Sequence, residues 1–136
     1  MIKAAEVATK KGYTIKMKGF DANPFIVDYA QSRTKKNGNI RIEVGDVFDN
    51  NFFSDSNDFV SANIFLHHFS EEEIISFIQQ AMPKTNQAII ICDLHRTPIA
   101  YYAFIAITML FGANYITRND GKISILKGFK KKEWRA

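Results

Sequence analysis

The amino-acid sequence predicts an α/β fold built on a parallel sheet of about four strands. Strand-like apolar segments alternate with helix-like segments along the chain, which is typical of parallel sheets with crossover helices. Two of the expected strands lead directly into an acidic residue, Asp21 or Asp46. A continuous apolar run at residues 88–92 has the length and character of a parallel strand covered on both faces. The four strands are expected near residues 14–20, 40–44, 58–63 and 87–93.

The expected helices carry recognisable end signals. Residues 2–11 form an amphipathic pattern, and Gly12 follows in the position of a C-terminal cap. Pro24 stands where a first helical turn accepts proline, and an apolar stripe follows it. Ser70 and Glu73 have the spacing of a capping box, so a helix is expected to start at Ser70. Helices are therefore expected before and after the first strand and after the third.

Composition and length favour one domain over residues 1–136. The hydrophobic fraction is 46%, and 136 residues fall in the common size range of single domains. The single cysteine, Cys92, rules out an internal disulfide and reads as a small buried hydrophobe. The net charge is +4, but the short lysine runs are explained more simply as solvated surface than as nucleic-acid contacts. Glu6 interrupts the apolar stretch that a signal peptide would need, so a cytoplasmic location is the default expectation.

Residues 97–117 carry no charge and invite comparison with a membrane span. A span needs about twenty apolar residues, and the apolar part here is residues 98–111. Gly112 and Asn114 interrupt the pattern near its end, and three α/β units precede it. We therefore expect a helix buried against the sheet and no membrane span.

Three motifs occur in the order and spacing of a known enzyme family. They are Asp21-Ala-Asn-Pro24, Gly45-Asp46-Val47, and Asp58-Phe-Val-Ser-Ala-Asn63 followed by Ile64-Phe-Leu-His-His-Phe69. On these motifs, residues 14–93 resemble the middle of a class I S-adenosylmethionine-dependent methyltransferase. The resemblance implies a Rossmann-like parallel sheet with helices on both faces, and S-adenosylmethionine as the cofactor.

The same resemblance implies that parts of the family's domain are missing from this chain. In the family, a first strand with a glycine-rich loop precedes the helix expected at residues 2–11, and no Gly-x-Gly lies before Gly12. Residues 118–134 resemble small-molecule methyltransferases of the polyketide-tailoring or quinone-modifying type, in which a further strand pair follows. We therefore expect a single, truncated domain, an internal fragment without the first strand and the C-terminal hairpin.

The resemblance implies a set of cofactor-binding residues at the strand ends. Asp21, with Ala22 beside it, corresponds to the position that binds the ribose hydroxyls. Asp46 would accept a hydrogen bond from the adenine amino group, and the Val47 backbone N–H would address the ring. Asn63 corresponds to the position that lines the methionine end of the cofactor. Each also has a purely structural explanation: Asp21 as an Asx turn or helix cap, the Gly-Asp pair as a turn, and Asn63 as a strand-terminal turn residue.

The resemblance implies that the histidine pair His67 and His68 lies at the mouth of the acceptor site. A histidine titrates near neutral pH, so His68 could assist deprotonation of an acceptor hydroxyl, and His67 could contact the acceptor. The alternative is a packed, hydrogen-bonded histidine. A metal site is not expected, because adjacent histidines rarely converge on one ion and no His-Glu-x-x-His spacing occurs.

Two further residues are predicted to touch the acceptor. Arg96 could orient an anionic acceptor, or it could pair with Asp93. In the resembling family a helix inserted after the fifth strand roofs the acceptor pocket, which makes residues 98–111 an apolar lid with Tyr101 as a contact. That helix is expected to shelter a pocket near Asn63 and His68.

The function that the resemblance implies is transfer of a methyl group from S-adenosylmethionine to a small, apolar, hydroxylated acceptor. The alternative is a noncatalytic α/β remnant, or a nucleotide- or nucleic-acid-binding module, which the charge of +4 permits but no aromatic-basic motif supports. The chain by itself is expected to bind cofactor weakly and to be inactive. The strands at residues 14–20 and 58–63 are expected to pair directly.

Overall fold

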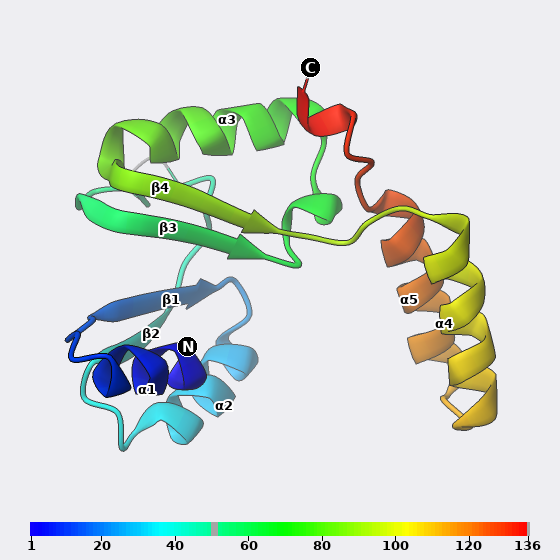
Figure 1. Ribbon diagram of the computed structural model, residues 1–136, viewed down its shortest axis with the longest axis horizontal. Coiled ribbons are helices and arrows are strands. Elements are labelled where there is room, and N and C mark those ends of the chain that lie inside the picture. Colours follow the sequence, from blue (N-terminus) through cyan, green and yellow to red (C-terminus); the bar gives the residue numbers. More distant parts are fainter. Residues whose placement is uncertain (50–51, 136) are drawn as a thin grey trace. The chain divides into compact units, whose positions relative to one another are not determined.

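The computed structural model describes residues 1–49 and 52–135 (Figure 1). The chain divides into two compact units, Met1–Phe53 and Ser54–Ala136. Each unit contains two parallel strands and its own helices. We describe the two units separately.

The first unit is a parallel strand pair with two helices. Its elements are α1 (Ile2–Lys10), β1 (Met17–Asp21), α2 (Pro24–Thr34) and β2 (Ile40–Val44). The register places Asp21 opposite Val44, so β1 and β2 end side by side. Val27 of α2 and Ile40 of β2 are buried and form the small core of this unit. The Asn23 side chain caps α2 by accepting a hydrogen bond from the Phe25 amide.

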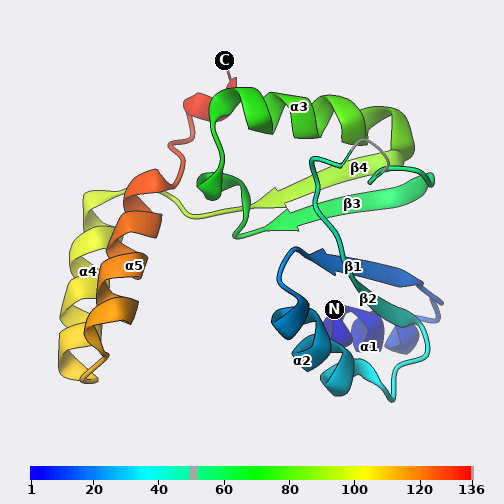
Figure 2. The ribbon, with the colours of Figure 1, turned by 180° about the vertical axis from the view of Figure 1, so that it is seen from behind.

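The second unit begins with another parallel strand pair. Its elements are β3 (Asn57–Asn63), η1 (Leu66–His68), α3 (Glu71–Ala81), η2 (Met82–Lys84), β4 (Thr85–Cys92), α4 (Pro98–Leu110), α5 (Tyr115–Lys127) and η3 (Glu133–Arg135). Figures 1 and 2 both show α3 running along one side of the β3–β4 pair. Ala62, Leu66, Phe77 and Ala81 are buried in this region. The capping box of Ser70 and Glu73 is present, as expected, and fixes the start of α3.

Helices α4 and α5 form a hairpin that lies beyond the carboxyl end of β4 (Figure 2). Gly121 of α5 makes the close packing possible, because a Cβ atom there would overlap the ring of Phe104 on α4. After α5 the chain returns to the segment that follows β4. The Phe129 amide donates to the Leu94 carbonyl at 2.8 Å, and the Arg96 amide donates to the Phe129 carbonyl at 3.0 Å. These bonds attach the base of the hairpin to the rest of the second unit.

Replacement of Gly121 by Ala is expected to destabilise the hairpin, although alanine is the better helix former. The propensity gain is about 1 kcal/mol. The overlap with Phe104 is a case of overpacking, which typically costs about 1–3 kcal/mol. We expect a lower midpoint of thermal unfolding, measured by circular dichroism. Gly38→Ala, where nothing lies within 4 Å of the added Cβ, is the control. A higher midpoint for Gly121→Ala would show that Phe104 moves aside at no cost.

The predicted fold class is confirmed. The four strands and their parallel pairing agree with an incomplete Rossmann-like α/β fold. Within the first unit β1 pairs with β2, and within the second unit β3 pairs with β4. The expected pairing of the strands at residues 14–20 and 58–63 would join the two units and stays a prediction.

Two burial expectations differ from the structure. Residues 88–92 are expected to be covered on both faces, but exposed and half-buried residues alternate along most of β4, and Cys92 is exposed. Within the second unit, α3 lies along one side of this strand pair (Figure 1). Helix α4 exists as expected but packs against α5, and it leaves Ile99, Tyr102 and Leu110 exposed. Within the part of the chain described, no helix is long and apolar enough to cross a membrane.

Candidate functional site

The first unit places Asp21 and Asp46 at the same edge of one sheet. Asp21 is the last residue of β1, and Asp46 follows the end of β2 by two residues. The Gly45 amide donates to the Asp21 carbonyl at 3.1 Å, which ties the two strand ends together. Both aspartates are exposed. The carboxyl ends of adjacent parallel strands are where α/β sheets bind their ligands.

Each of these aspartates forms an Asx turn with one of its two carboxylate oxygens. Oδ1 of Asp21 accepts from the Asn23 amide at 2.8 Å, and Oδ1 of Asp46 accepts from the Phe48 amide at 3.0 Å. Within residues 1–49 and 52–135, Oδ2 of neither aspartate has a hydrogen-bond partner. The turn interpretation is therefore correct for both residues. It leaves one carboxylate oxygen of each free for a ligand.

Aromatic packing shapes the backbone beside these two carboxylates. The rings of Phe20 and Phe52 lie 4.5 Å apart between centroids. A Cβ atom at Gly45 would lie 2.8 Å from the Phe20 ring and 3.2 Å from the Phe52 ring. Glycine at this position thus lets the β2 end approach the aromatic pair closely. Val47, the predicted contact for an adenine ring, is half-buried next to this turn, and Ala22 is exposed beside Asp21.

The second unit contains a buried carboxylate, Asp93, that organises the turn after β3. Its Oδ2 accepts from three successive amides, those of Phe65 at 3.0 Å, Leu66 at 2.7 Å and His67 at 3.3 Å. Its Oδ1 accepts from Nδ1 of His67 at 2.7 Å and from the Leu94 amide at 2.7 Å. The side chains of Asp93 and His67 are each 2% exposed. Asp93 therefore links the end of β4 to the end of β3.

The backbone of this turn is strained at Ile64. Ile64 has a φ of 50°, in the left-handed region that β-branched residues rarely adopt. Its amide donates to the Cys92 carbonyl at 2.7 Å, and the next three amides all bond to Asp93. Strain of this kind costs about 1–3 kcal/mol and persists only where surrounding contacts hold it. Here the bonds to Asp93 and to β4 provide those contacts.

The hydrogen bonds hold Asp93 in its ionised form. Burial by itself would raise the pKa of Asp93, but the bonds from the Leu94 amide, the His67 ring and the Phe65 amide outweigh it, and the net pKa is lowered from the ordinary value of 3.8. Since the carboxylate is an acceptor at both oxygens, Nδ1 of His67 carries the proton in this pair. The pair is thus a charge-assisted contact inside the unit.

The stability of the second unit is expected to fall in acid because of Asp93. The lowered pKa means that the folded unit binds this proton less tightly than the unfolded chain. The stabilisation is therefore fully present above the ordinary value of 3.8 and is lost as the pH falls through the lowered pKa. Urea unfolding at each pH, followed by the fluorescence of Trp134, the only tryptophan, measures the free energy of unfolding. Asp93→Asn should show a shallower decline between about pH 5 and pH 2. An unchanged decline would assign acid sensitivity to other groups.

His68 lies next to this pair but is exposed. Its ring centroid is 4.1 Å from that of His67. Burial, then the neighbouring His67 and Lys127, lower the pKa of His68 below 6.5, while Asp93 acts in the opposite direction. His68 is therefore mostly neutral at pH 7 and can accept a proton. His67, by contrast, is buried and bound to Asp93, which agrees with the packed-histidine alternative; its predicted contact with an acceptor stays a prediction.

The remaining candidates of the second unit have separate partners. Arg96 forms an ion pair with Glu133 and not with Asp93, so that predicted alternative is wrong; Asp93 already binds His67. The side-chain amide of Asn63 donates to the Ser61 hydroxyl at 2.8 Å.

Tyr101 lines a cavity of about 150 Å³ between α4 and α5, whose lining includes neither Asn63 nor His68. The expected pocket near those two residues stays a prediction. Within the described part of the chain, no cluster of three His, Cys, Asp or Glu residues could hold a metal ion.

The comparison with protein families identifies the chain. A family described as a methyltransferase domain matches residues 3–87, which include both strand pairs up to the start of β4. The chain belongs to this methyltransferase family. Domains of the family generally use S-adenosylmethionine, and the parallel α/β arrangement agrees with its fold. A search of curated proteins found no match. Helices α4 and α5 lie outside the matched residues.

Sequence reasoning missed the central role of Asp93 in this methyltransferase domain. It gave Asp93 as the end of the fourth expected strand and as a possible partner of Arg96. The anchoring function depends on three amides that are 26 to 28 residues away in the chain. One signal was present: an aspartate that directly follows an apolar strand must find hydrogen-bond donors if it is buried.

Proposed function

We propose that this methyltransferase domain binds S-adenosylmethionine through the edge formed by Asp21 and Asp46, and that the acceptor is a small, apolar, hydroxylated molecule. The observation that supports cofactor binding at this edge is the pair of Asx turns formed by Asp21 and Asp46. Two exposed carboxylates at adjacent strand ends each keep one oxygen free. A nucleoside presents donors that match such oxygens, the ribose hydroxyls and the adenine amino group.

Each residue of this edge has a specific role in the proposal. Asp21 accepts hydrogen bonds from the ribose hydroxyls, as acidic residues at this strand end do in nucleotide-binding α/β folds. Asp46 accepts a hydrogen bond from the adenine amino group, and the Val47 backbone N–H contacts the adenine ring. The bound cofactor supplies an activated methyl group, so the protein mainly has to align its partners. Asn63 remains a predicted contact for the methionine end.

His68 is the proposed base for the acceptor. The support is its exposure together with a pKa below 6.5, which leaves the imidazole neutral and able to take a proton from a hydroxyl at pH 7. Asp93 and His67 act behind it as positioning residues, because they hold the turn on which His68 stands. Arg96 forms an ion pair with Glu133, and this pair competes with binding of an anionic acceptor at Arg96. Tyr101 lines the α4–α5 cavity and stays a proposed acceptor contact.

A nuclear magnetic resonance titration tests the cofactor proposal. S-adenosylmethionine is added to the ¹⁵N-labelled chain, and the amide signals of Ala22, Gly45 and Val47 are followed, because this method detects millimolar binding as well as tight binding. We expect saturable shifts at these amides and none at Lys10 or Gly38. The absence of saturable shifts at these amides, or equal shifts at Lys10 and Gly38, would contradict the proposal.

A parallel titration with adenosine triphosphate separates the proposal from the alternative of a nucleotide-binding module. Two carboxylates with free oxygens should disfavour a triphosphate close by, since like charges repel. S-adenosylmethionine carries a positive sulfonium and should bind better. Equal or tighter binding of the triphosphate would favour the nucleotide-binding alternative.

A further inference from the structure

The tip of the α4–α5 hairpin exposes a contiguous group of large apolar side chains. Leu110 and Phe111 are each 80% exposed at the end of α4, and Tyr115 is 79% exposed at the start of α5. Met109 and Ile116 are exposed beside them. We call these five residues the hairpin tip. No charged residue occurs from Thr97 to Thr117, so the tip has no charge of its own.

Three consecutive amides of the hairpin loop are hydrogen-bonded within the hairpin. The amides of Phe111, Gly112 and Ala113 donate to carbonyls of α4 at 3.0, 3.3 and 3.0 Å. Gly112 has a φ of 63°, the conformation that ends α4, and the Asn114 side chain accepts from the Thr117 amide at 2.8 Å to begin α5. Unpaired backbone groups are the main obstacle to moving a loop out of water. These bonds lower that cost for the loop.

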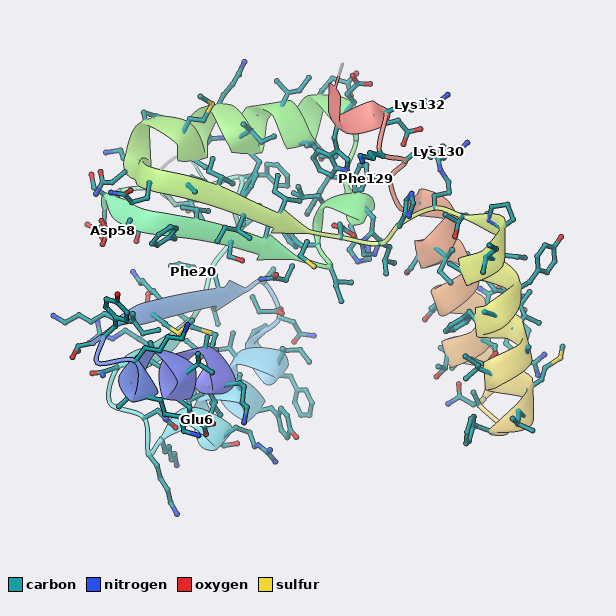
Figure 3. All side chains as sticks on the ribbon, in the orientation of Figure 1. Glu6, Phe20, Asp58, Phe129, Lys130 and Lys132 are labelled. Carbon is teal, nitrogen blue, oxygen red and sulfur yellow. The ribbon has the colours of Figure 1, made fainter. Side chains whose placement is uncertain are left out.

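Positive charge is concentrated in the part of the chain that carries the hairpin. Residues 96–136 contain eight Lys or Arg and two Asp or Glu, a net charge of +6, whereas residues 1–95 have a net charge of −2. Figure 3 shows Lys130 and Lys132 pointing outward on the segment that follows α5. This asymmetry indicates a negatively charged partner for the hairpin part of the second unit.

Two of these cations lie on the hairpin, close to the tip. Arg118 and Lys122 of α5 are half-buried and line the cavity of about 150 Å³ together with Tyr101, Ile105, Thr108 and Met109. Within the described residues, neither cation forms an ion pair. Long basic side chains beside an apolar surface are suited to the boundary between hydrocarbon and water, where the stem stays apolar and the charge meets an anion.

We propose that the α4–α5 hairpin binds the surface of a bilayer that contains anionic phospholipids. The hairpin tip enters the boundary between headgroups and acyl chains, to a depth of about 5–10 Å, as interfacial helices do. Arg118 and Lys122 contact headgroup phosphates, and the basic segment after α5 adds attraction at longer range. Asp120 is the only acid between residues 97 and 132 and reduces this attraction slightly. The proposal concerns peripheral binding and does not depend on methyl transfer.

Vesicle flotation with the full chain tests the proposal. Vesicles of phosphatidylcholine with about one third phosphatidylglycerol are expected to carry the protein, and pure phosphatidylcholine vesicles much less. Binding should weaken as sodium chloride rises from about 0.05 M to about 0.5 M, because salt screens the attraction. Flotation excludes aggregates, which sediment. No binding to anionic vesicles, or equal binding to both kinds, would overturn the proposal.

Matched variants locate the contact. Phe111→Ser is expected to lower the partition coefficient at least about fivefold, because it removes an inserted aromatic ring. Phe25→Ser is the control, since Phe25 is 77% exposed on α2 in the other unit, and it should leave the coefficient within about twofold. Lys122→Gln should weaken binding, whereas Lys36→Gln, on the loop before β2 in the first unit, should weaken it less.

The main competing occupant of the hairpin tip is a second copy of the chain. Analytical ultracentrifugation of the wild type and of Phe111→Ser separates the two. A dimer that is lost in Phe111→Ser, in a protein that does not float with anionic vesicles, would overturn the membrane proposal in favour of self-association. A monomer that floats would support it. Equal effects of Phe111→Ser and Phe25→Ser on flotation would show non-specific adsorption and also overturn it.

Discussion

Replacing Asp93 by Ala is expected to lower the free energy of unfolding of the second unit by about 3–5 kcal/mol, because several buried donors lose their acceptor and each unsatisfied donor costs about 1–3 kcal/mol. The carboxylate accepts five hydrogen bonds from the main chain and from the His67 ring. Its loss leaves these donors without an acceptor in a region where Asp93 and His67 are 2% exposed. The strained φ of Ile64 would also lose the bonds that hold it. Urea unfolding followed by Trp134 fluorescence measures the change.

Two variants show whether the effect belongs to the hydrogen-bond network. Asp58→Ala removes an exposed aspartate of β3 that accepts one bond from Asn86, and should change the free energy of unfolding by less than about 0.5 kcal/mol. Ile64→Gly relieves the left-handed strain and should recover part of the loss when it is combined with Asp93→Ala. A loss below about 1 kcal/mol for Asp93→Ala would mean that water replaces the carboxylate and that the network is not a stabilising element.

Removing the carboxylate of Asp21 is expected to weaken binding of S-adenosylmethionine at least about tenfold. A hydrogen bond to a charged group contributes about 1.5–3 kcal/mol, and the proposed ribose contact contains at least one. Nuclear magnetic resonance titration, with shifts at Ala22 and Val47 as the signal, measures the dissociation constant. Asp28→Ala, an exposed aspartate of α2 in the same unit, is the matched control and should not change it.

Asp21→Asn distinguishes the ligand role from the turn role. Asparagine keeps an oxygen for the bond from the Asn23 amide, so the Asx turn and the start of α2 survive. It loses the negative charge and one acceptor. If Asp21 binds ribose, Asp21→Asn should weaken the cofactor nearly as much as Asp21→Ala does. If Asp21 only shapes the turn, Asp21→Asn should bind like the wild type and Asp21→Ala should bind weakly or unfold.

Local signals in the sequence were reliable where neighbouring residues decide the structure. The cap at Gly12, the proline start of α2 and the capping box at Ser70 are all present, because each depends on contacts within a few residues. The alternation of strands and helices also predicted parallel pairing within each unit. Helix α5 was not among the expected helices. Its packing depends on Gly121, which makes room for Phe104 of α4.

Some features of the candidate site also follow from the sequence, and others depend on tertiary contacts. The sequence by itself determined that acidic residues end two adjacent parallel strands, and that the chain has the motif order of a methyltransferase. Tertiary structure alone decided that Asp93 binds the turn after β3, and that α4 packs against α5 instead of the sheet. The physical reason is range: strand ends and caps follow from short-range backbone bonding, whereas burial and partner choice depend on which distant segments meet.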